Sequence, residues 1–162
     1  SSLLAAGKAH IINADDPARP PIEGKDGGEA LLNHRLGWVV GGSDGTLKPS
    51  GVNIGTLAMK GDERIILFQK STAFNEAQRA YPELIQHGQG SAAAWSSIWD
   101  EGLAPVSVRR GKNSKGTILN TTQMRVQGTH VSGVPISVAT IVNSDPTDHD
   151  ETAENAEMPA AA

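Results

Sequence analysis

The chain has 162 residues, of which 38% are hydrophobic, and a formal net charge of −4 at pH 7. This length suffices for one domain with a real core but not for two full domains. The absence of cysteine excludes a disulfide framework, thiolate metal sites and a cysteine nucleophile. No apolar stretch approaches the ~20 residues that span a bilayer. The opening residues also lack the basic region of a signal peptide, so we expect no membrane partner.

Charge is distributed unevenly along the chain. Residues 143–162 carry six acidic residues and neither lysine nor arginine. Residues 35–142 carry eleven lysines and arginines against seven acidic residues, an excess of four positive charges. Asymmetry of this kind indicates interactions with partners rather than a particular fold.

The first part of the chain is interpreted as an N-terminal arm, residues 1–33. Residues 1–12 contain apolar side chains around a central glycine and predict a short helix or strand. Residues 13–29 contain three prolines, three glycines and seven charges, a composition that cannot build a core. We therefore expect that residues 1–29 can be removed without unfolding the body of the protein, which we place at residues 34–142.

Three strands are predicted in the first half of this body, at residues 36–40, 52–59 and 64–70. The glycine- and aspartate-rich segment 41–45 and the segment 60–63 have the composition of tight turns. The last of these strands contains four consecutive large apolar residues. Such a run predicts a strand that is buried on both faces.

A helical insert is predicted around residues 72–100, where the apolar period changes to that of a helix. The first helix would end near Ala80, with Ser71 or Thr72 as its N-cap, and Ser91 would cap a second helix. On the second helix the spacing places three large apolar side chains on one face. Those three residues are Trp95, Ile98 and Trp99. Three large aromatic side chains are expected to anchor the core because they bury the most area: Trp38, Phe68 and Trp95.

The second half of the body is predicted to be β-structure again, with strands at residues 105–110, 118–126 and 134–142. The tail, residues 143–162, has no apolar periodicity. Strands before and after a helical insert predict an α+β fold of mainly antiparallel β-structure. We expect a small barrel or sandwich with extended termini.

Four basic residues in one predicted loop are the candidates for contact with phosphate groups or with an acidic partner: Arg109, Arg110, Lys112 and Lys115. The loop does not match the phosphate-binding P-loop pattern, because Lys112 is followed by Asn113 rather than by serine or threonine. A solvated turn is the alternative interpretation. Trp95 and Trp99 could stack on nucleobases or pack in the core.

No catalytic, cofactor-binding or metal-binding residues are predicted. The five histidines do not form the spaced pairs of zinc sites. Adjacent acidic residues lie on predicted turns, whereas general acid–base catalysis needs two carboxyl groups in different environments across a cleft. The acidic residues of the tail do not follow the spacing of an EF-hand loop.

These observations favour a non-enzymatic assembly subunit of a larger particle, most plausibly a bacteriophage virion component such as a capsid-decorating or tail protein. Extended termini would join it to neighbours, because segments that order on binding can wrap a large surface. The expected partners are further copies of the chain and other particle proteins, in the virion or the cytoplasm. The alternative is a protein that binds single-stranded nucleic acid through a five-stranded OB-like barrel, the basic loop and the two tryptophans, with an acidic C-terminal tail that competes with nucleic acid or recruits a partner.

Overall fold

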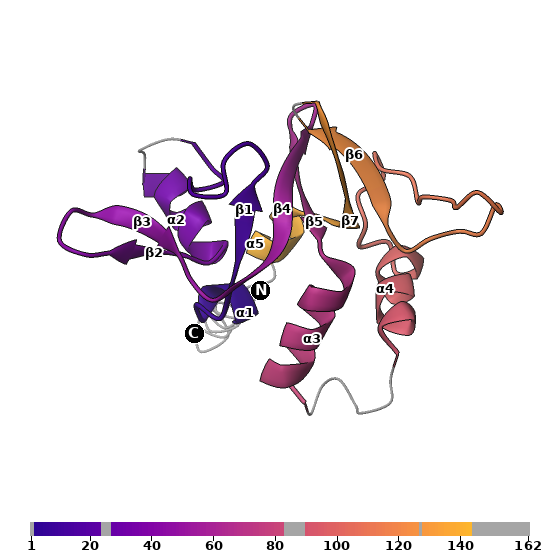
Figure 1. Ribbon diagram of the computed structural model, residues 1–162, viewed down its shortest axis with the longest axis horizontal. Coiled ribbons are helices and arrows are strands. Elements are labelled where there is room, and N and C mark those ends of the chain that lie inside the picture. The colour runs from indigo at the N-terminus through magenta and orange to yellow at the C-terminus, as the bar shows by residue number, and fades with distance from the viewer. Residues whose placement is uncertain (1, 24–26, 83–89, 127, 144–162) are drawn as a thin grey trace, which may run out of the picture.

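The computed structural model describes residues 2–23, 27–82, 90–126 and 128–143, and the acidic tail lies outside these residues. A five-stranded sheet forms the centre of the fold (Figure 1). Its strands, in spatial order, are β1 (Ala9–Asn13), β4 (Val52–Lys60), β5 (Glu63–Phe68), β7 (Thr129–Ser137) and β6 (Thr122–Val126). A separate hairpin consists of β2 (Trp38–Gly41) and β3 (Thr46–Pro49). The helices are α1 (Ser2–Ala5), α2 (Gly27–Arg35), α3 (Lys70–Ala80), α4 (Ser91–Asp100) and α5 (Val138–Asn143).

The strand pairing confirms a mixed α+β fold that is mostly antiparallel. The β4–β5, β5–β7, β6–β7 and β2–β3 pairs are antiparallel, and β1 joins β4 in parallel. This pairing by itself does not establish the more specific prediction of a barrel or sandwich. Among the residues described, the sheet order places β1 and β6 at its two ends, and no pair closes it into a barrel. Within this part of the chain no helix is both long and apolar enough to cross a membrane.

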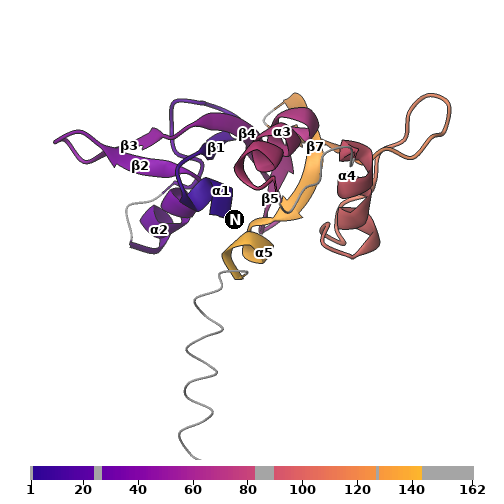
Figure 2. The same cartoon turned by 90° about the horizontal axis from the view of Figure 1, so that it is seen from below.

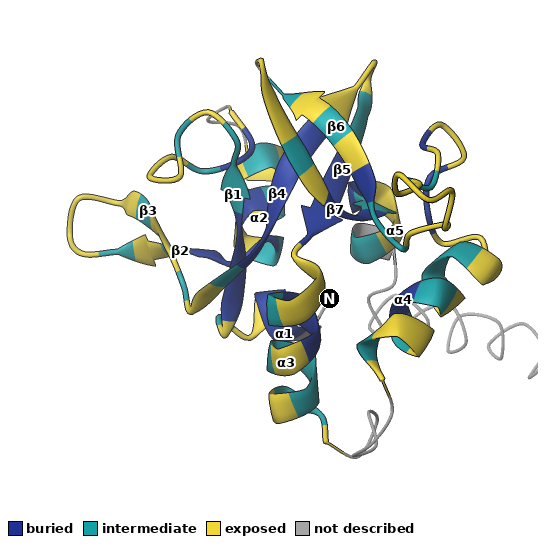
Figure 3. Cartoon of the chain, turned by 45° about the vertical axis from the view of Figure 1, so that its right-hand side comes forward, coloured by how far each residue is buried: buried dark blue, intermediate teal, exposed yellow. Residues whose placement is uncertain are grey.

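The hairpin of β4 and β5 is the centre of the core, as its sequence predicts. Ile65, Ile66 and Leu67 are each at most 1% exposed. Successive side chains of a strand point to opposite faces, so Ile66 enters one apolar cluster while Ile65 and Leu67 enter a second cluster on the other face. The expectation of burial on both faces is therefore confirmed (Figure 3).

The first thirteen residues are part of the sheet and core rather than an extended arm. Leu3, Leu4 and Ile11 are buried in the larger apolar cluster. The Ile11 N–H donates a hydrogen bond of 3.0 Å to the carbonyl oxygen of Leu36. The body closes its core around β1, so we now expect, against the sequence-based prediction, that the body loses part of its core without residues 1–29.

Close backbone contacts around β1 require glycine at two positions. Gly37 has φ of +92°, and a Cβ there would lie 2.1 Å from the carbonyl oxygen of Ala9. Gly51 has φ of +63°, and a Cβ there would lie 2.0 Å from the carbonyl oxygen of Lys8. Larger residues would be strained at both positions and would push the edge strand out of place.

A buried side chain fastens the proline-rich loop that follows β1. Asn33 on α2 is 2% exposed. Its Oδ1 accepts a hydrogen bond of 3.0 Å from the Ile22 N–H, and its Nδ2 donates one of 2.9 Å to the Ile22 carbonyl oxygen. The Asn33 side chain thus bonds both backbone groups of Ile22, as a neighbouring strand would do in a sheet.

Replacing Asn33 by leucine should destabilise the protein by roughly 2–4 kcal/mol, because the buried N–H and carbonyl groups of Ile22 would lose their partners. Chemical denaturation, which reports the free energy of unfolding, measures this loss. Asn13→Ala is the matched control, because the Asn13 side chain accepts from the more exposed Asp15 N–H. Equal stability of the two variants would contradict the fastening role.

The helical insert is present as α3 and α4, but its predicted caps are wrong. The N-cap residues are Gln69 and Gly90, and neither makes a side-chain capping hydrogen bond. Ser71 lies inside α3, and Ser91 is the first residue of α4. The helices therefore begin without a side-chain cap, and their stability comes from packing of Phe74 and Trp95 in the core.

One predicted strand in the second half, and the end of another, take other conformations; residues 134–137 of the predicted strand 134–142 are confirmed as part of β7. Residues 105–110 form turns, in which the Val108 N–H donates 3.1 Å to the Pro105 carbonyl oxygen, so the predicted strand there is wrong. Residues 138–142 belong to α5 rather than to a strand. Helical spacing returns Val138 and Ile141 to the same apolar cluster, which overrides the preference of β-branched residues for strands.

The turn between β2 and β3 matches its glycine- and aspartate-rich sequence. Gly42 and Gly45 have φ of +78° and +73°. Hydrogen bonds from the side chain and the backbone N–H of Thr46 lower the pKa of the Asp44 carboxyl group. These interactions give the exposed hairpin a defined shape.

Candidate functional site

The basic residues predicted as a contact site lie on a loop that projects beyond α4 (Figures 1 and 2). The Leu119 N–H donates 2.8 Å to the carbonyl oxygen of Gly111, and the Gly111 N–H donates 2.8 Å to that of Thr121. At the tip, the Asn113 Oδ1 accepts hydrogen bonds of 2.9 Å from the N–H groups of Lys115 and Thr117. We call residues 109–120 the basic loop. Its own hydrogen bonds preorganise its projecting shape.

Arg110 fixes the root of the basic loop to α4. Its guanidinium group lies 5.5 Å from the ring centroid of Trp99, and its Nε and Nη2 donate to the Leu119 carbonyl oxygen and the Asn120 Oδ1. The Trp99 Nε1 donates 2.8 Å to the Asn120 carbonyl oxygen. Asn120 in turn donates 3.1 Å to the carbonyl oxygen of Ala92 on α4. Arg110 and Trp99 thus serve the internal structure, and the guanidinium lies where a base would stack on the indole.

The other three predicted contact residues point outward. Arg109, Lys112 and Lys115 are exposed, and no ion pair joins them to an acidic side chain within the described residues. The nearby Asp100 carboxylate lies 3.9 Å from Arg110 instead. Among the described residues, no acidic side chain offsets the positive charge that the basic loop carries on this projecting element, and such a charge attracts acidic partners.

Trp95, the second stacking candidate, lies in the core. It is 9% exposed, and its Nε1 donates 3.0 Å to the carbonyl oxygen of Lys70. One helical turn further along α4, Trp99 packs against the second apolar cluster, which contains Ile65 and Leu67. The structure thus does not form a shared platform from the two indoles, although sequence spacing places them on one face of α4.

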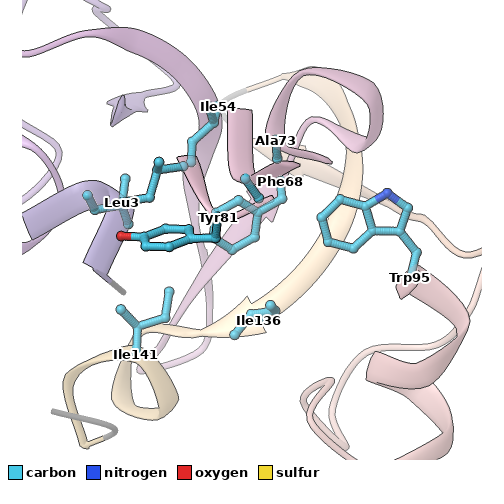
Figure 4. A pocket seen from close by; sticks show the side chains of 10 residues that line it. Leu3, Ile54, Phe68, Ala73, Tyr81, Trp95, Ile136 and Ile141 are labelled. Atoms are coloured by element: carbon cyan, nitrogen blue, oxygen red, sulfur yellow. The ribbon is translucent and has the colours of Figure 1, made fainter. Parts of the chain in front are cut away.

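An apolar pocket of about 350 Å³ lies between the sheet and the helices (Figure 4). The ring of Tyr81 extends across the pocket, and Trp95 lies at its far end (Figure 4). The indole N–H is already bonded to Lys70, so the pocket presents carbon surface with the Tyr81 hydroxyl as a polar group. Ten residues line the pocket: Leu3, Leu4, Ile54, Phe68, Ala73, Ala77, Tyr81, Trp95, Ile136 and Ile141.

No pattern in the sequence predicts this pocket. Its lining comes from α1, β4, β5, α3, α4, β7 and α5, so no local pattern contains it. A volume near the lower end of the usual ~300–1,000 Å³ range suits a short apolar group. The pocket is therefore the second candidate for an interaction site.

Among the described residues, no group of three or more histidine, aspartate or glutamate side chains is placed to hold a metal ion. The acidic residues of the tail lie outside this part of the chain. Comparison with known proteins found no match: no family model, no curated protein and no solved structure is significantly similar to this chain.

Proposed function

We propose that the protein is a non-enzymatic assembly subunit of a larger particle, of the kind represented by capsid-decorating and tail proteins of bacteriophage virions. The observation that carries this proposal is the pair of elements that project from opposite sides of the body. One is the β2–β3 hairpin and the other is the basic loop (Figure 1). Projections in opposite directions provide contacts to two neighbours at once.

The composition of these projections supports a role in protein contacts. Eight large apolar side chains in the described residues are exposed. Ile118 and Leu119 lie on the basic loop, and Leu103 and Val106 lie in the segment that leads from α4 to this loop. On the β2–β3 hairpin, Val40 is 67% exposed. Exposed apolar residues that gather on a projection mark protein interaction surfaces more than isolated ones do.

In this proposal the two projecting elements, rather than an N-terminal arm, contact the neighbouring subunits. The first thirteen residues are committed to the sheet and core of their own chain. The composition of the tail, six acidic residues and no basic ones, supports a second means of contact.

Light scattering of the full chain over a concentration series tests the proposal directly. We expect a closed ring or a larger assembly without nucleic acid. A monomer at every concentration, with or without an oligonucleotide at low salt, would contradict it. A species that grows only when the oligonucleotide is added would favour the alternative function.

Binding of single-stranded nucleic acid is the second candidate, and the three unpaired cations of the basic loop favour it. If it is correct, the triple variant Arg109→Ala, Lys112→Ala and Lys115→Ala should bind an oligonucleotide more weakly. The loss of three phosphate contacts should also flatten the slope of log affinity against log salt by about 2, given ~0.7 per contact for single strands. Fluorescence anisotropy at several salt concentrations measures both quantities.

The matched control for this test is Lys48→Ala on the β2–β3 hairpin, an exposed cation outside the basic loop. It should leave the slope unchanged by the same assay. Equal affinity and equal slope for the triple variant and the wild-type chain would exclude the basic loop as a nucleic-acid contact.

A further inference from the structure

A pocket of about 450 Å³ lies where the loop that follows β1 meets the β4–β5 hairpin and the end of β6. Leu57, Met59 and Arg64 share one face of the hairpin, because Leu57 and Met59 are two residues apart on β4 and Arg64 pairs opposite Met59. Asn13, the last residue of β1, pairs with Leu57 and so lies on the same face. All four line this cavity together with Arg125 of β6, and we call it the charged pocket.

Hydrogen bonds fix the loop that forms one wall of the charged pocket. Ile22 of this wall is 3% exposed, and the Asn33 side chain bonds both of its backbone groups. At the start of the loop, the Asn13 Oδ1 accepts a hydrogen bond of 2.9 Å from the Asp15 N–H. This bond fixes the turn that carries the Asp15 carboxylate. The wall is therefore formed before a ligand enters, and such preorganisation lowers the entropic cost of binding.

Opposite charges line the charged pocket without pairing with one another. Arg64 and Arg125 contribute two guanidinium groups, and Asp15 contributes a carboxylate. Within the part of the chain that the structure describes, no ion pair or side-chain hydrogen bond joins any of these three groups to a partner. The other carboxylate of the lining, that of Glu23, lies 3.5 Å from Arg19 instead. Arg64 is half-buried, and a partly desolvated charge is stabilised by a partner of opposite sign.

The mixture of groups selects the chemistry of the ligand. An anion without a positive group would bind the two arginines but would be repelled by Asp15, and a simple cation would meet the reverse. Apolar side chains complete the lining, and Met59 among them is 52% exposed although it is large and apolar. A small molecule that carries a carboxylate, an ammonium group and an aliphatic chain would supply a partner for each of these features.

We propose that the charged pocket binds a free α-amino acid with an aliphatic side chain. The ligand carboxylate accepts hydrogen bonds from Arg64 and Arg125, since guanidinium groups match the planar geometry of a carboxylate. The ammonium group donates to Asp15, and the aliphatic side chain packs on Ile22 and Met59. The pocket volume falls within the usual ~300–1,000 Å³ of small-molecule sites. This binding activity goes beyond the proposed assembly function and does not depend on it.

Three matched ligands test the proposal by isothermal titration calorimetry of the full chain. L-Leucine carries both charges, 4-methylpentanoate lacks only its amino group, and 3-methylbutylamine lacks only its carboxylate. We expect a dissociation constant below about 1 mM for leucine. Each of the two analogues should bind at least about ten-fold more weakly, because a site built around a polar group discriminates against an analogue that lacks it.

Two variants assign the two charges of the ligand to their partners. Arg125→Gln should weaken leucine binding at least about ten-fold and leave 3-methylbutylamine binding unchanged, because only the carboxylate loses a partner. Asp15→Asn should weaken leucine binding to a similar extent and should not weaken the binding of 4-methylpentanoate. Both positions are exposed, so neither change disturbs the core. A purely structural role would not produce this crossed pattern.

Matched controls remove the same charges outside the charged pocket. Arg79→Gln lies on α3, and Asp16→Asn lies next to Asp15; neither residue belongs to the lining. The Asp16 Oδ1 accepts a hydrogen bond of 2.9 Å from the Ala18 N–H, and asparagine retains this acceptor. Both controls should bind leucine with the affinity of the wild-type chain.

The outcomes are decisive for the site and separate it from the assembly function. Absence of leucine binding would overturn the proposal. Equal affinity for leucine and 4-methylpentanoate would overturn it as well, because the pocket would then recognise any carboxylate. Unchanged leucine binding by Arg125→Gln and Asp15→Asn would place the ligand elsewhere. None of these results changes the expected light scattering, so the assembly function stands or fails by its own measurement.

Discussion

Removal of residues 1–13 is expected to unfold the protein. The deletion takes away α1, the edge strand β1 and the buried side chains Leu3, Leu4 and Ile11. Loss of a buried leucine or isoleucine to alanine costs roughly 2–5 kcal/mol. Three such losses together reach a large part of the ~5–15 kcal/mol that stabilises a whole domain. Circular dichroism and thermal unfolding of the truncated chain measure the effect.

Point variants distinguish lost packing from a general effect of truncation. Leu4→Asp places a charge in the larger apolar cluster and should be strongly destabilising, whereas Ala6→Asp, two residues further along at an exposed position, should change stability by no more than about 0.5 kcal/mol. A truncated chain that retains the cooperative unfolding transition of the full chain would show that β1 is dispensable.

Trp38→Ala is expected to destabilise the protein by roughly 3–5 kcal/mol, as the loss of a fully buried large aromatic side chain does. Trp38 is 0% exposed, and its Nε1 donates 2.9 Å to the carbonyl oxygen of Ile11. Its ring also meets the ring of His10 edge-on, with 6.1 Å between centroids. Trp38 therefore joins the β2–β3 hairpin to the edge strand. Denaturant titration gives the change in the free energy of unfolding.

Trp38→Phe is the matched control for this variant. It keeps an aromatic ring in the cavity but leaves the Ile11 carbonyl oxygen without its donor, so a smaller loss of about 1–3 kcal/mol is expected. If the alanine and phenylalanine variants lose equal stability, the hydrogen bond rather than the packed ring accounts for the role of Trp38. A loss below 1 kcal/mol for the alanine variant would show that the hairpin does not depend on this anchor.

The central hairpin and the helical insert are determined by local sequence. The segment from Val52 to Phe68 has an apolar run on each side of a turn, and Gly61 at that turn has φ of +60°. The apolar period alone predicts α3 and the helical face of α4, and the buried anchors Trp38, Phe68 and Trp95 are confirmed by exposures of at most 9%. In each case the signal lies within a few residues of where it acts.

Tertiary structure decided the remainder, because the deciding contacts join residues far apart in the chain. The parallel pairing of β1 with β4 makes a strand of the first residues, and packing of Ile141 against the core gives α5 a helical form where β-branched residues predict a strand. The packing of Arg110 on Trp99 turned two predicted contact residues into the root of the basic loop. The apolar pocket, which is lined by residues as far apart in the chain as Leu3 and Ile141, exists only in the folded chain, since long-range burial and not local preference places its walls.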